Sequence, residues 1–291
     1  MAPILEVKNL HRVYSAGTPF EHIALDDVSF SIERGEFVGI IGHTGSGKST
    51  LIQHLNGLLK PDSGSVILDG KDIWSNKALT RQTRFRVGLV FQYPEYQLFE
   101  ETVYKDIAFG PKNMGLDEEE IDRRVKMAAQ FCGVTDEMLA GSPFDLSGGQ
   151  KRRVAIAGII AMMPKMLVLD EPCAGLDPEG RELILSQVKN YQLTTGSTVI
   201  LVSHSMEDIA NYADKVLVME NGHIYNYDTT EKVFRDAENL SRMGLGIPDI
   251  TKVFLKLKEM GVDIGTDVYT IPYAVKQLLK YKQAKEDAKN A

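Results

Sequence analysis

Cysteine and tryptophan are scarce in this sequence. Its 291 residues include two cysteines, Cys132 and Cys173, and one tryptophan. Two cysteines are too few for the disulfide framework of a small secreted protein, so the composition favours a reducing cytosol. The longest apolar run, Val154–Met163, has about half of the ~20 residues that a membrane-spanning helix needs. The first residues also lack the charged-then-apolar pattern of a signal peptide. We therefore expect a chain that does not cross a membrane by itself.

Positive charge is not in excess. Lys and Arg total 33 against 40 Asp and Glu, which gives a net charge of −7. Nucleic-acid-binding domains usually carry a surplus of basic residues on one face, so the balance argues against a nucleic-acid partner, although it leaves room for a local basic patch. The hydrophobic content of 43% is that of an ordinary globular protein. The length suffices for one large domain and a small appendage.

Short apolar runs predict the strands of an α/β core. Alternating residues predict strands from Ile4 and over Val28–Ile32. Buried strands are predicted at GEFVGIIG, VGLVFQ, MLVLDEP, TVILVSH and KVLVME. Helical spacing between Glu101 and Met163 predicts a helical insert, and the Asn-Gly pair in ENGHIYNYD predicts a hairpin.

The last part of the chain, residues 236–291, predicts two short amphipathic helices. The first ends at Gly261 and would carry four apolar residues on one face: Ile250, Val253, Phe254 and Leu257. The second would begin after Thr270 as a possible N-cap, with Pro272 in its first turn. Two such helices bury little by themselves, so we expect them to pack on the core or on a partner chain.

A glycine-rich run between a strand and a helix predicts a phosphate cradle. The run GHTGSGKST fits the pattern G-x-x-x-x-G-K-[ST]. It comprises Gly42, His43, Thr44, Gly45, Ser46, Gly47, Lys48, Ser49 and Thr50. The glycines let backbone N–H groups turn towards phosphate oxygens, and the start of the helix adds its positive end. Lys48 would reach the β- and γ-phosphates, and Ser49 would bind Mg²⁺.

Two later strands end in residues suited to phosphate chemistry. In MLVLDEP, apolar residues carry Asp170 to a strand end, where its carboxylate can hold Mg²⁺ through water. Glu171 points elsewhere and could accept a proton from the attacking water. In TVILVSH, His204 could contact the γ-phosphate, although a lone strand-end histidine is often present only for solubility.

The run LSGGQ opens a helix and does not fit a second nucleotide pocket. It has no lysine, yet Ser147, Gly148 and Gly149 offer a hydroxyl and backbone N–H groups at a helix N-terminus. Such a surface could close the cradle of a second copy if two copies meet head to tail, giving two composite sites. Alternatively, Ser147 is simply the cap of a helix that begins near Gly149, and it could also do both.

Taken in order, these motifs resemble those of ATP-binding-cassette (ABC) ATPases. GHTGSGKS resembles the Walker A motif, LSGGQ the signature, MLVLDE the Walker B motif, AGLDP the D-loop and VSH the H-loop. Gln92 resembles the Q-loop glutamine, and Tyr14 resembles the aromatic residue that stacks on adenine. The resemblance covers about Ile4–Phe234 and has no degenerate position. Cys173 is one departure, because small or hydroxyl residues are more usual there.

This resemblance implies an α/β fold: a P-loop ATPase core with a mixed β-sheet and flanking helices. The ATPase domain would span residues 1–235, with a helical subdomain at about 101–163 and a C-terminal dimerisation extension at 236–291. ATP and Mg²⁺ would be the cofactors, with Ser49, Gln92 and Asp170 at the metal. The ATP of a partner subunit would contact Ser147, Gly148, Gly149, Gln150 and Asp177. Glu171, His204 and Gln92 would be catalytic.

The run QYPEYQLFEETVYKDIAFGPKN begins at Gln92. It resembles the same region in the ATPases of energy-coupling-factor (ECF) importers, whose substrates are vitamins or transition-metal ions. Its apolar residues Tyr93, Tyr96, Leu98 and Phe99 would dock a membrane partner, although some could belong to a buried loop. The resemblance implies three partners at the cytoplasmic face of the membrane: a second ABC ATPase, identical or related, a transmembrane coupling protein and a substrate-binding membrane protein.

Two other classes of function compete with this interpretation. Soluble ABC ATPases of translation or DNA repair usually carry two cassettes, a long coiled-coil insert or basic surfaces, and none of these is evident here. A P-loop kinase or GTPase would need its own acceptor or base-specificity motif, and LSGGQ would then be accidental. We find no such motif.

Overall fold

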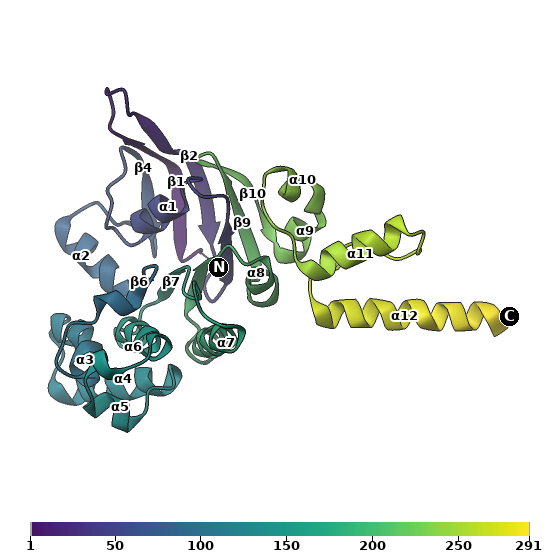
Figure 1. Cartoon of the computed structure of the whole chain (residues 1–291). Coiled ribbons are helices and arrows are strands. Elements are labelled where there is room, and N and C mark those ends of the chain that lie inside the picture. The colour runs from purple at the N-terminus through teal and green to yellow at the C-terminus, as the bar shows by residue number, and fades with distance from the viewer. Residues whose placement is uncertain (1, 291) are drawn as a thin grey trace.

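The computed structural model describes residues 2–290, with side chains through residue 285. Met1 and Ala291, the outermost residues of the two expected domains, lie outside the described part. Two sheets form the centre of the molecule, helices α3 to α6 gather on one side, and α11 and α12 extend away on the other (Figure 1). The α/β ATPase fold expected from the sequence is confirmed, with its strands divided between two sheets.

The larger sheet has six strands in the order β10-β9-β3-β8-β7-β6. Its strands are β3 (Phe37–Ile41), β6 (Val87–Val90), β7 (Met166–Asp170), β8 (Thr198–Val202), β9 (Lys215–Glu220) and β10 (His223–Thr229). All of these strands except β10 run parallel to one another. Every residue of β3, β7 and β8 is buried, as the apolar runs predict. The antiparallel β9–β10 pair is the hairpin predicted from Asn-Gly.

The smaller sheet is antiparallel, in the order β2-β1-β4-β5. Its strands are β1 (Leu5–Tyr14), β2 (His22–Ile32), β4 (Ser63–Leu68) and β5 (Lys71–Asp72). Strand β2 begins at His22, well before the predicted start at Val28, and β1 continues to Tyr14. Register shifts interrupt their pairing, and Asn9 and Asp27 adopt left-handed backbone angles, with φ of 47° and 51°. These bulges break the strict alternation by which a strand is recognised in a sequence.

Helices surround the larger sheet and form the insert. Beside the sheet lie α1 (Lys48–Leu55), α2 (Lys77–Arg86), α7 (Pro178–Thr195), α8 (Met206–Tyr212), α9 (Thr230–Arg235) and α10 (Ala237–Arg242). The expected insert contains α3 (Val103–Asn113), α4 (Glu118–Phe131), α5 (Asp136–Ala140) and α6 (Gly148–Ile160). The short 3₁₀ turns are η1 (Pro94–Gln97) and η2 (Pro143–Asp145). One continuous apolar cluster joins this insert to one face of the larger sheet.

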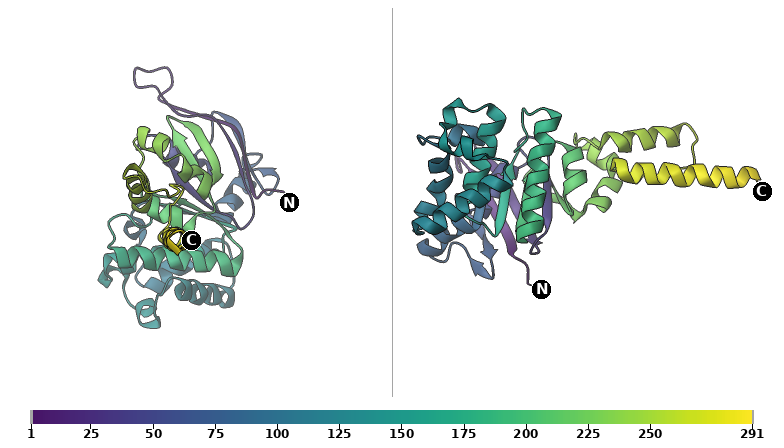
Figure 2. Two further views of the ribbon diagram at one scale, coloured as in Figure 1. Left: turned by 90° about the vertical axis from the view of Figure 1, so that its right-hand side faces the viewer. Right: turned by 90° about the horizontal axis from the view of Figure 1, so that it is seen from below.

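The C-terminal helices α11 (Asp249–Glu259) and α12 (Ile271–Asn290) lie side by side and project from the body (Figure 2). Phe254, Val268 and Ala274 form a small buried cluster between them. Thr251 is also buried, because its hydroxyl donates to the Val268 carbonyl at 2.7 Å, whereas Val253 is 51% exposed. Within residues 2–290, the structure shows no helix long and apolar enough to cross a membrane.

Candidate functional site

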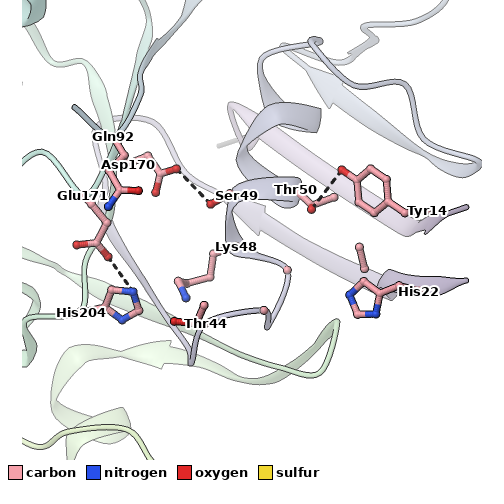
Figure 3. Close-up of a pocket in the computed structure, with 13 residues that line it drawn as sticks. Tyr14, His22, Thr44, Lys48, Ser49, Thr50, Gln92, Asp170, Glu171 and His204 are labelled. Carbon is pink, nitrogen blue, oxygen red and sulfur yellow. Dashed lines mark hydrogen bonds and ion pairs between the residues drawn. The ribbon is translucent and has the colours of Figure 1, made fainter. Parts of the chain in front are cut away.

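A cavity of about 370 Å³ opens where the glycine-rich loop meets the carboxyl ends of β6, β7 and β8. Figure 3 shows the residues that line it. From the predicted set these are Tyr14, Thr44, Gly45, Gly47, Lys48, Ser49, Thr50, Gln92, Asp170, Glu171 and His204. The structure therefore brings together residues from five segments that are far apart in the sequence.

The glycine-rich loop has a backbone path that side chains would not permit. Gly42, Gly45 and Gly47 have φ of 157°, 84° and 101°. A Cβ atom on Gly42 would lie 2.5 Å from both the Met219 carbonyl oxygen and Ser46 Oγ, and one on Gly47 would collide with the Ala24 carbonyl. Gly42 and Gly47 are thus required by close packing as well as by conformation, and Gly45 by conformation alone.

Lys48 begins α1 and is almost fully buried beneath the loop. Its Nζ donates to the carbonyl oxygens of Gly42 at 2.6 Å and His43 at 2.9 Å. Burial lowers the pKa of Lys48, while the charges of Glu171 and Asp170 oppose this shift. Three of the predicted nucleotide-binding residues lie outside the cavity lining: Gly42, His43 and Ser46. The Ser46 N–H donates to the His43 carbonyl, and the Ser46 carbonyl accepts from the Gly222 N–H, both at 3.1 Å, so these bonds help to fix the shape of the loop.

Asp170 and Ser49 form an oxygen-rich corner of the cavity. Ser49 Oγ donates to Asp170 Oδ2 at 3.2 Å, and Gln92 follows β6 beside them. Burial raises the pKa of Asp170, while the Ser49 hydroxyl and then Lys48 oppose the shift. Hydroxyl, carboxylate and amide oxygens are the donors that Mg²⁺ accepts, with the remaining positions left to phosphate and water, so these residues fit the ion.

Glu171 directly follows β7 and has a left-handed backbone, with φ of 50°. Its Oε1 lies 3.4 Å from His204 Nε2, beyond the end of the neighbouring strand β8. Burial raises the pKa of Glu171 to about 7. Burial and then the charge of Lys48 lower the pKa of His204. The site thus pairs an uncharged imidazole with a carboxyl group that can exchange a proton near neutral pH.

The cavity also contains residues that motif reasoning missed. His22 and Ala24 line it, and His22 pairs with Tyr14 across the β1–β2 ladder. Tyr14 Oη lies 3.5 Å from Thr50 Oγ1, so this end of the cavity joins the antiparallel sheet to α1. Extending the strand predicted at Val28–Ile32 back along the one that starts near Ile4 could have located His22 opposite Tyr14, but the bulged register hides that relationship.

Ser147 is the N-cap of α6 and lies outside the cavity lining. Its Oγ accepts from the Gln150 N–H at 3.3 Å, and Gln150 Oε1 accepts from the Ser147 N–H at 2.9 Å, a capping box. The predicted cap is therefore confirmed. Apart from their chain neighbours and the backbone of their own helix, no atom of the described residues lies within 4 Å of a Cβ built on Gly148 or Gly149. This surface is open in the single chain, as a site completed by a second copy requires.

Asp177 also lies outside the cavity and caps α7, where its Oδ1 accepts from the Gly180 N–H at 2.8 Å. Its predicted contact with a partner subunit needs an exposed position. The structure places it in the turn that connects the Glu171 segment to α7.

The predicted docking residues divide into two groups. Leu98 and Phe99 line an apolar groove of about 390 Å³ between α3 and α6. The other apolar lining residues include Phe109, Val154, Ala155, Ile159 and Met162. Tyr93 and Tyr96 lie outside the groove lining, with Tyr96 85% exposed and their ring centroids 6.2 Å apart. The alternative, that some of these residues belong to a buried loop, holds for Leu98, which packs against the core cluster, and not for Phe99, which is 58% exposed.

A phosphate cradle that faces an acidic strand end within this fold defines a P-loop nucleoside triphosphatase. The family model described as ABC transporter matches residues 25–174. A model described as AAA domain, putative AbiEii toxin, Type IV TA system, matches the shorter segment 142–208.

Similar proteins indicate the type of ABC transporter protein to which the chain is related. The energy-coupling factor transporter ATP-binding protein EcfA2 of Caldanaerobacter subterraneus subsp. tengcongensis is 55% identical over 277 residues, covering 95% of this chain and 97% of the relative. EcfA2 of Clostridium perfringens is 53% identical with the same coverage. The structure of cbiO1 from Clostridium perfringens, part of the ABC transporter complex cbiONQ, has a TM-score of 0.75 and 39% identity, covering 90% of this chain and 98% of that one.

The dimeric ATP-binding cassette MJ0796, solved with ADP and Pi, has a TM-score of 0.70 and 27% identity, covering 78% of this chain and 98% of that one. The chain belongs to the ABC transporter family, among the ATP-binding proteins of energy-coupling factor transporters. It is accordingly an ATPase coupled to transport.

Proposed function

We propose that the chain is the ATP-hydrolysing subunit of an ECF-type importer at the cytoplasmic face of the membrane. It works with a second ABC ATPase, a transmembrane coupling protein and a substrate-binding membrane protein, and drives uptake of a vitamin or a transition-metal ion. One observation carries the proposal beyond ATP hydrolysis. An apolar groove rimmed by exposed aromatic residues starts a few residues after Gln92, which itself lines the nucleotide cavity.

Hydrolysis would proceed through the residues gathered in the cavity. Lys48 and the loop N–H groups bind the β- and γ-phosphates, and Tyr14 stacks on the base. Asp170, Ser49 and Gln92 would hold Mg²⁺, which would supply neutralisation of phosphate charge. The Glu171 carboxylate accepts a proton as the water oxygen attacks the γ-phosphorus. The bond to the bridging oxygen then breaks, and ADP leaves with the electron pair.

Closure of two cassettes would convert this chemistry into motion. Ser147, Gly148 and Gly149 of one copy contact the γ-phosphate held by the other, with Gln150 and Asp177 nearby. The open space above Gly148 and Gly149 supports this arrangement. Hydrolysis removes the γ-phosphate and with it the contact that favours the closed dimer.

The proposal includes a division of the chain into two domains. Residues 1–235 form the ATPase domain, with the helical subdomain at about 101–163, and residues 236–291 form a dimerisation extension. Several apolar side chains of α12 lack cover in the single chain: Ile271, Val275, Leu278 and Leu279 are 41–68% exposed. A second ATPase subunit packed on this face would bury them.

Co-purification tests the proposal. The chain is tagged in its native host, and membranes are solubilised in mild detergent. We expect a transmembrane coupling protein and a small membrane protein to accompany it, with or without a second ATPase. The ligand carried by the small protein then identifies the substrate. Recovery of ribosomes or nucleic-acid factors without membrane proteins would contradict the transport assignment and leave ATP hydrolysis intact.

A further inference from the structure

Arg152 is a charged residue on α6 that is only 3% exposed. Its Nε and Nη2 donate to the two carboxylate oxygens of Glu95, at 3.0 and 2.6 Å. Its Nη1 donates to the carbonyl oxygens of Pro172 and Ala174, at 3.1 and 2.6 Å. Burial alone would raise the pKa of Glu95, but the hydrogen bonds and charge of Arg152 bring it below its ordinary value. Each of the three guanidinium nitrogens of Arg152 thus donates at least one hydrogen bond.

These bonds join three separate functional segments. Glu95 belongs to η1, which follows Gln92 and leads into the groove. Ala174 closes a turn on the proposed catalytic base, since its N–H donates to the Glu171 carbonyl at 3.1 Å. The helix that carries Arg152 has Ser147 as its N-cap. The Arg152 side chain therefore connects the docking segment and the turn after Glu171 to the helix that presents the signature.

The two segments that Arg152 holds both contain strained backbone. Tyr93 has φ of 56° and ψ of 55°, and Glu171 has φ of 50°. Residues other than glycine are strained in this left-handed backbone region and stay there when the surrounding structure holds them. Such residues concentrate at functional sites. Arg152 also lies over the Tyr93 ring, with its Cζ 5.9 Å from the centroid. It contacts the first strained residue and fixes the carbonyls just beyond the second.

We propose that Arg152 is a positioning residue that links occupation of the docking groove to the geometry of Glu171. The guanidinium is planar and rigid, so a displacement of Glu95 by a docked partner cannot leave both carbonyl bonds unchanged. The turn after Glu171 would shift with it. The half of this inference that concerns docking rests on the proposed function, whereas the half that concerns Glu171 rests on ATP hydrolysis alone.

The first experiment measures ATP hydrolysis by the chain with its ATPase partner, without membrane subunits. Arg152→Gln is expected to lower kcat at least tenfold while the KM for ATP changes less than about threefold, because the cavity residues that bind ATP are untouched. Glu95→Gln should have a smaller effect. The double variant should be no worse than Arg152→Gln, since both act through one contact.

A matched control separates this role from loss of an ordinary ion pair. Arg123 makes the same two-bond contact with Glu120, but both residues lie on α4, and Arg123 is exposed. Arg123→Gln should leave kcat unchanged. If Arg152→Gln does not fold, Arg152→Lys keeps the charge but cannot bridge both partners, and it should show the same fall in kcat. Wild-type kcat in a folded Arg152 variant would overturn the inference.

The second experiment adds the membrane subunits. The membrane subunits should change the kcat of the wild type. The Arg152→Gln variant should still bind the membrane subunits but lose most of this change in kcat. An equal response in the variant would overturn the docking half. Failure of the wild type to bind any membrane subunit would remove that half together with the proposed function. The first experiment would then decide the role of Arg152 at Glu171.

Discussion

Glu171 Oε1 and His204 Nε2 lie 3.4 Å apart, just beyond the ends of the adjacent parallel strands β7 and β8. A hydrogen bond from the His204 backbone lowers the pKa of Glu171, but burial raises it by more. Because burial dominates its environment, the pKa of Glu171 rises to about 7. The proposed base is thus half protonated near neutral pH in the nucleotide-free chain, and its pKa determines how hydrolysis depends on pH.

The pH dependence of hydrolysis follows from this relationship. Only the deprotonated form of Glu171 can accept a proton from water, so kcat/KM for ATP should rise between about pH 6 and pH 8 with a midpoint near 7. This parameter reports the ionisation of the free enzyme. The residual activity of Glu171→Gln should lack that rise. A wild-type profile that is flat across this range would contradict the assignment of Glu171 as the base.

The same shift predicts a change in stability. The folded chain has a pKa of about 7 at Glu171 against 4.5 for the unshifted group. Between these values the folded state binds more protons than the unfolded state, so stability falls as pH rises. Glu171→Gln does not titrate there. Its free energy of unfolding relative to wild type should therefore increase from pH 5 to pH 8, by up to about 3 kcal/mol.

Urea denaturation at the two pH values, without nucleotide, measures this difference. An exposed carboxylate offers the control, and Glu238→Gln should give the same difference at both pH values because Glu238 is 81% exposed. A constant difference for Glu171→Gln would mean that the carboxyl group is not desolvated as the structure indicates.

Local patterns in the sequence were enough to locate most of the cavity. Parallel strands carry their carboxyl ends to one edge of a sheet, so Asp170 and His204 had to approach the loop that follows β3. His22 was missed because bulges disturb the alternation of its strand. The contact between Arg152 and Glu95 was missed for another reason. It joins residues 57 positions apart, and neither periodicity nor a motif marks it.

Two kinds of glycine predict two kinds of defect. A Cβ on Gly47 would collide with the Ala24 carbonyl, whereas one on Gly148 would enter open space. Gly47→Ala should therefore destabilise the chain by at least about 1 kcal/mol and weaken ATP binding. Gly148→Asp should leave both nearly unchanged, because a carboxylate is favourable near the start of α6.

The defect of Gly148→Asp should emerge only when two cassettes meet. Its carboxylate would face the γ-phosphate bound by the other copy, and like charges repel. We expect ATP-dependent association of the Glu171→Gln background to be lost in the double variant, as measured by size-exclusion chromatography with ATP. Association equal to that of Glu171→Gln alone would contradict the composite site.

The groove gives the most direct test of docking. Phe99 is 58% exposed at its rim and packs edge to face on Phe109, with ring centroids 5.0 Å apart. Truncating an aromatic anchor of an interface commonly costs about 2 kcal/mol or more. Phe99→Ser should therefore weaken binding to the membrane subunits by about thirtyfold or more. ATP affinity should not change, because Phe99 lies outside the nucleotide cavity.

Leu193 supplies the matched control for this variant. It is 72% exposed on α7 and lies outside the groove, so Leu193→Ser removes a comparable apolar surface elsewhere. Both variants should bind ATP like the wild type, while only Phe99→Ser loses the membrane subunits in a pull-down from detergent. Equal retention would mean that the partner docks on another surface, and the exposed Tyr93 and Tyr96 would be the next residues to replace. Equal loss would mean that the assay measures general surface hydrophobicity rather than the groove.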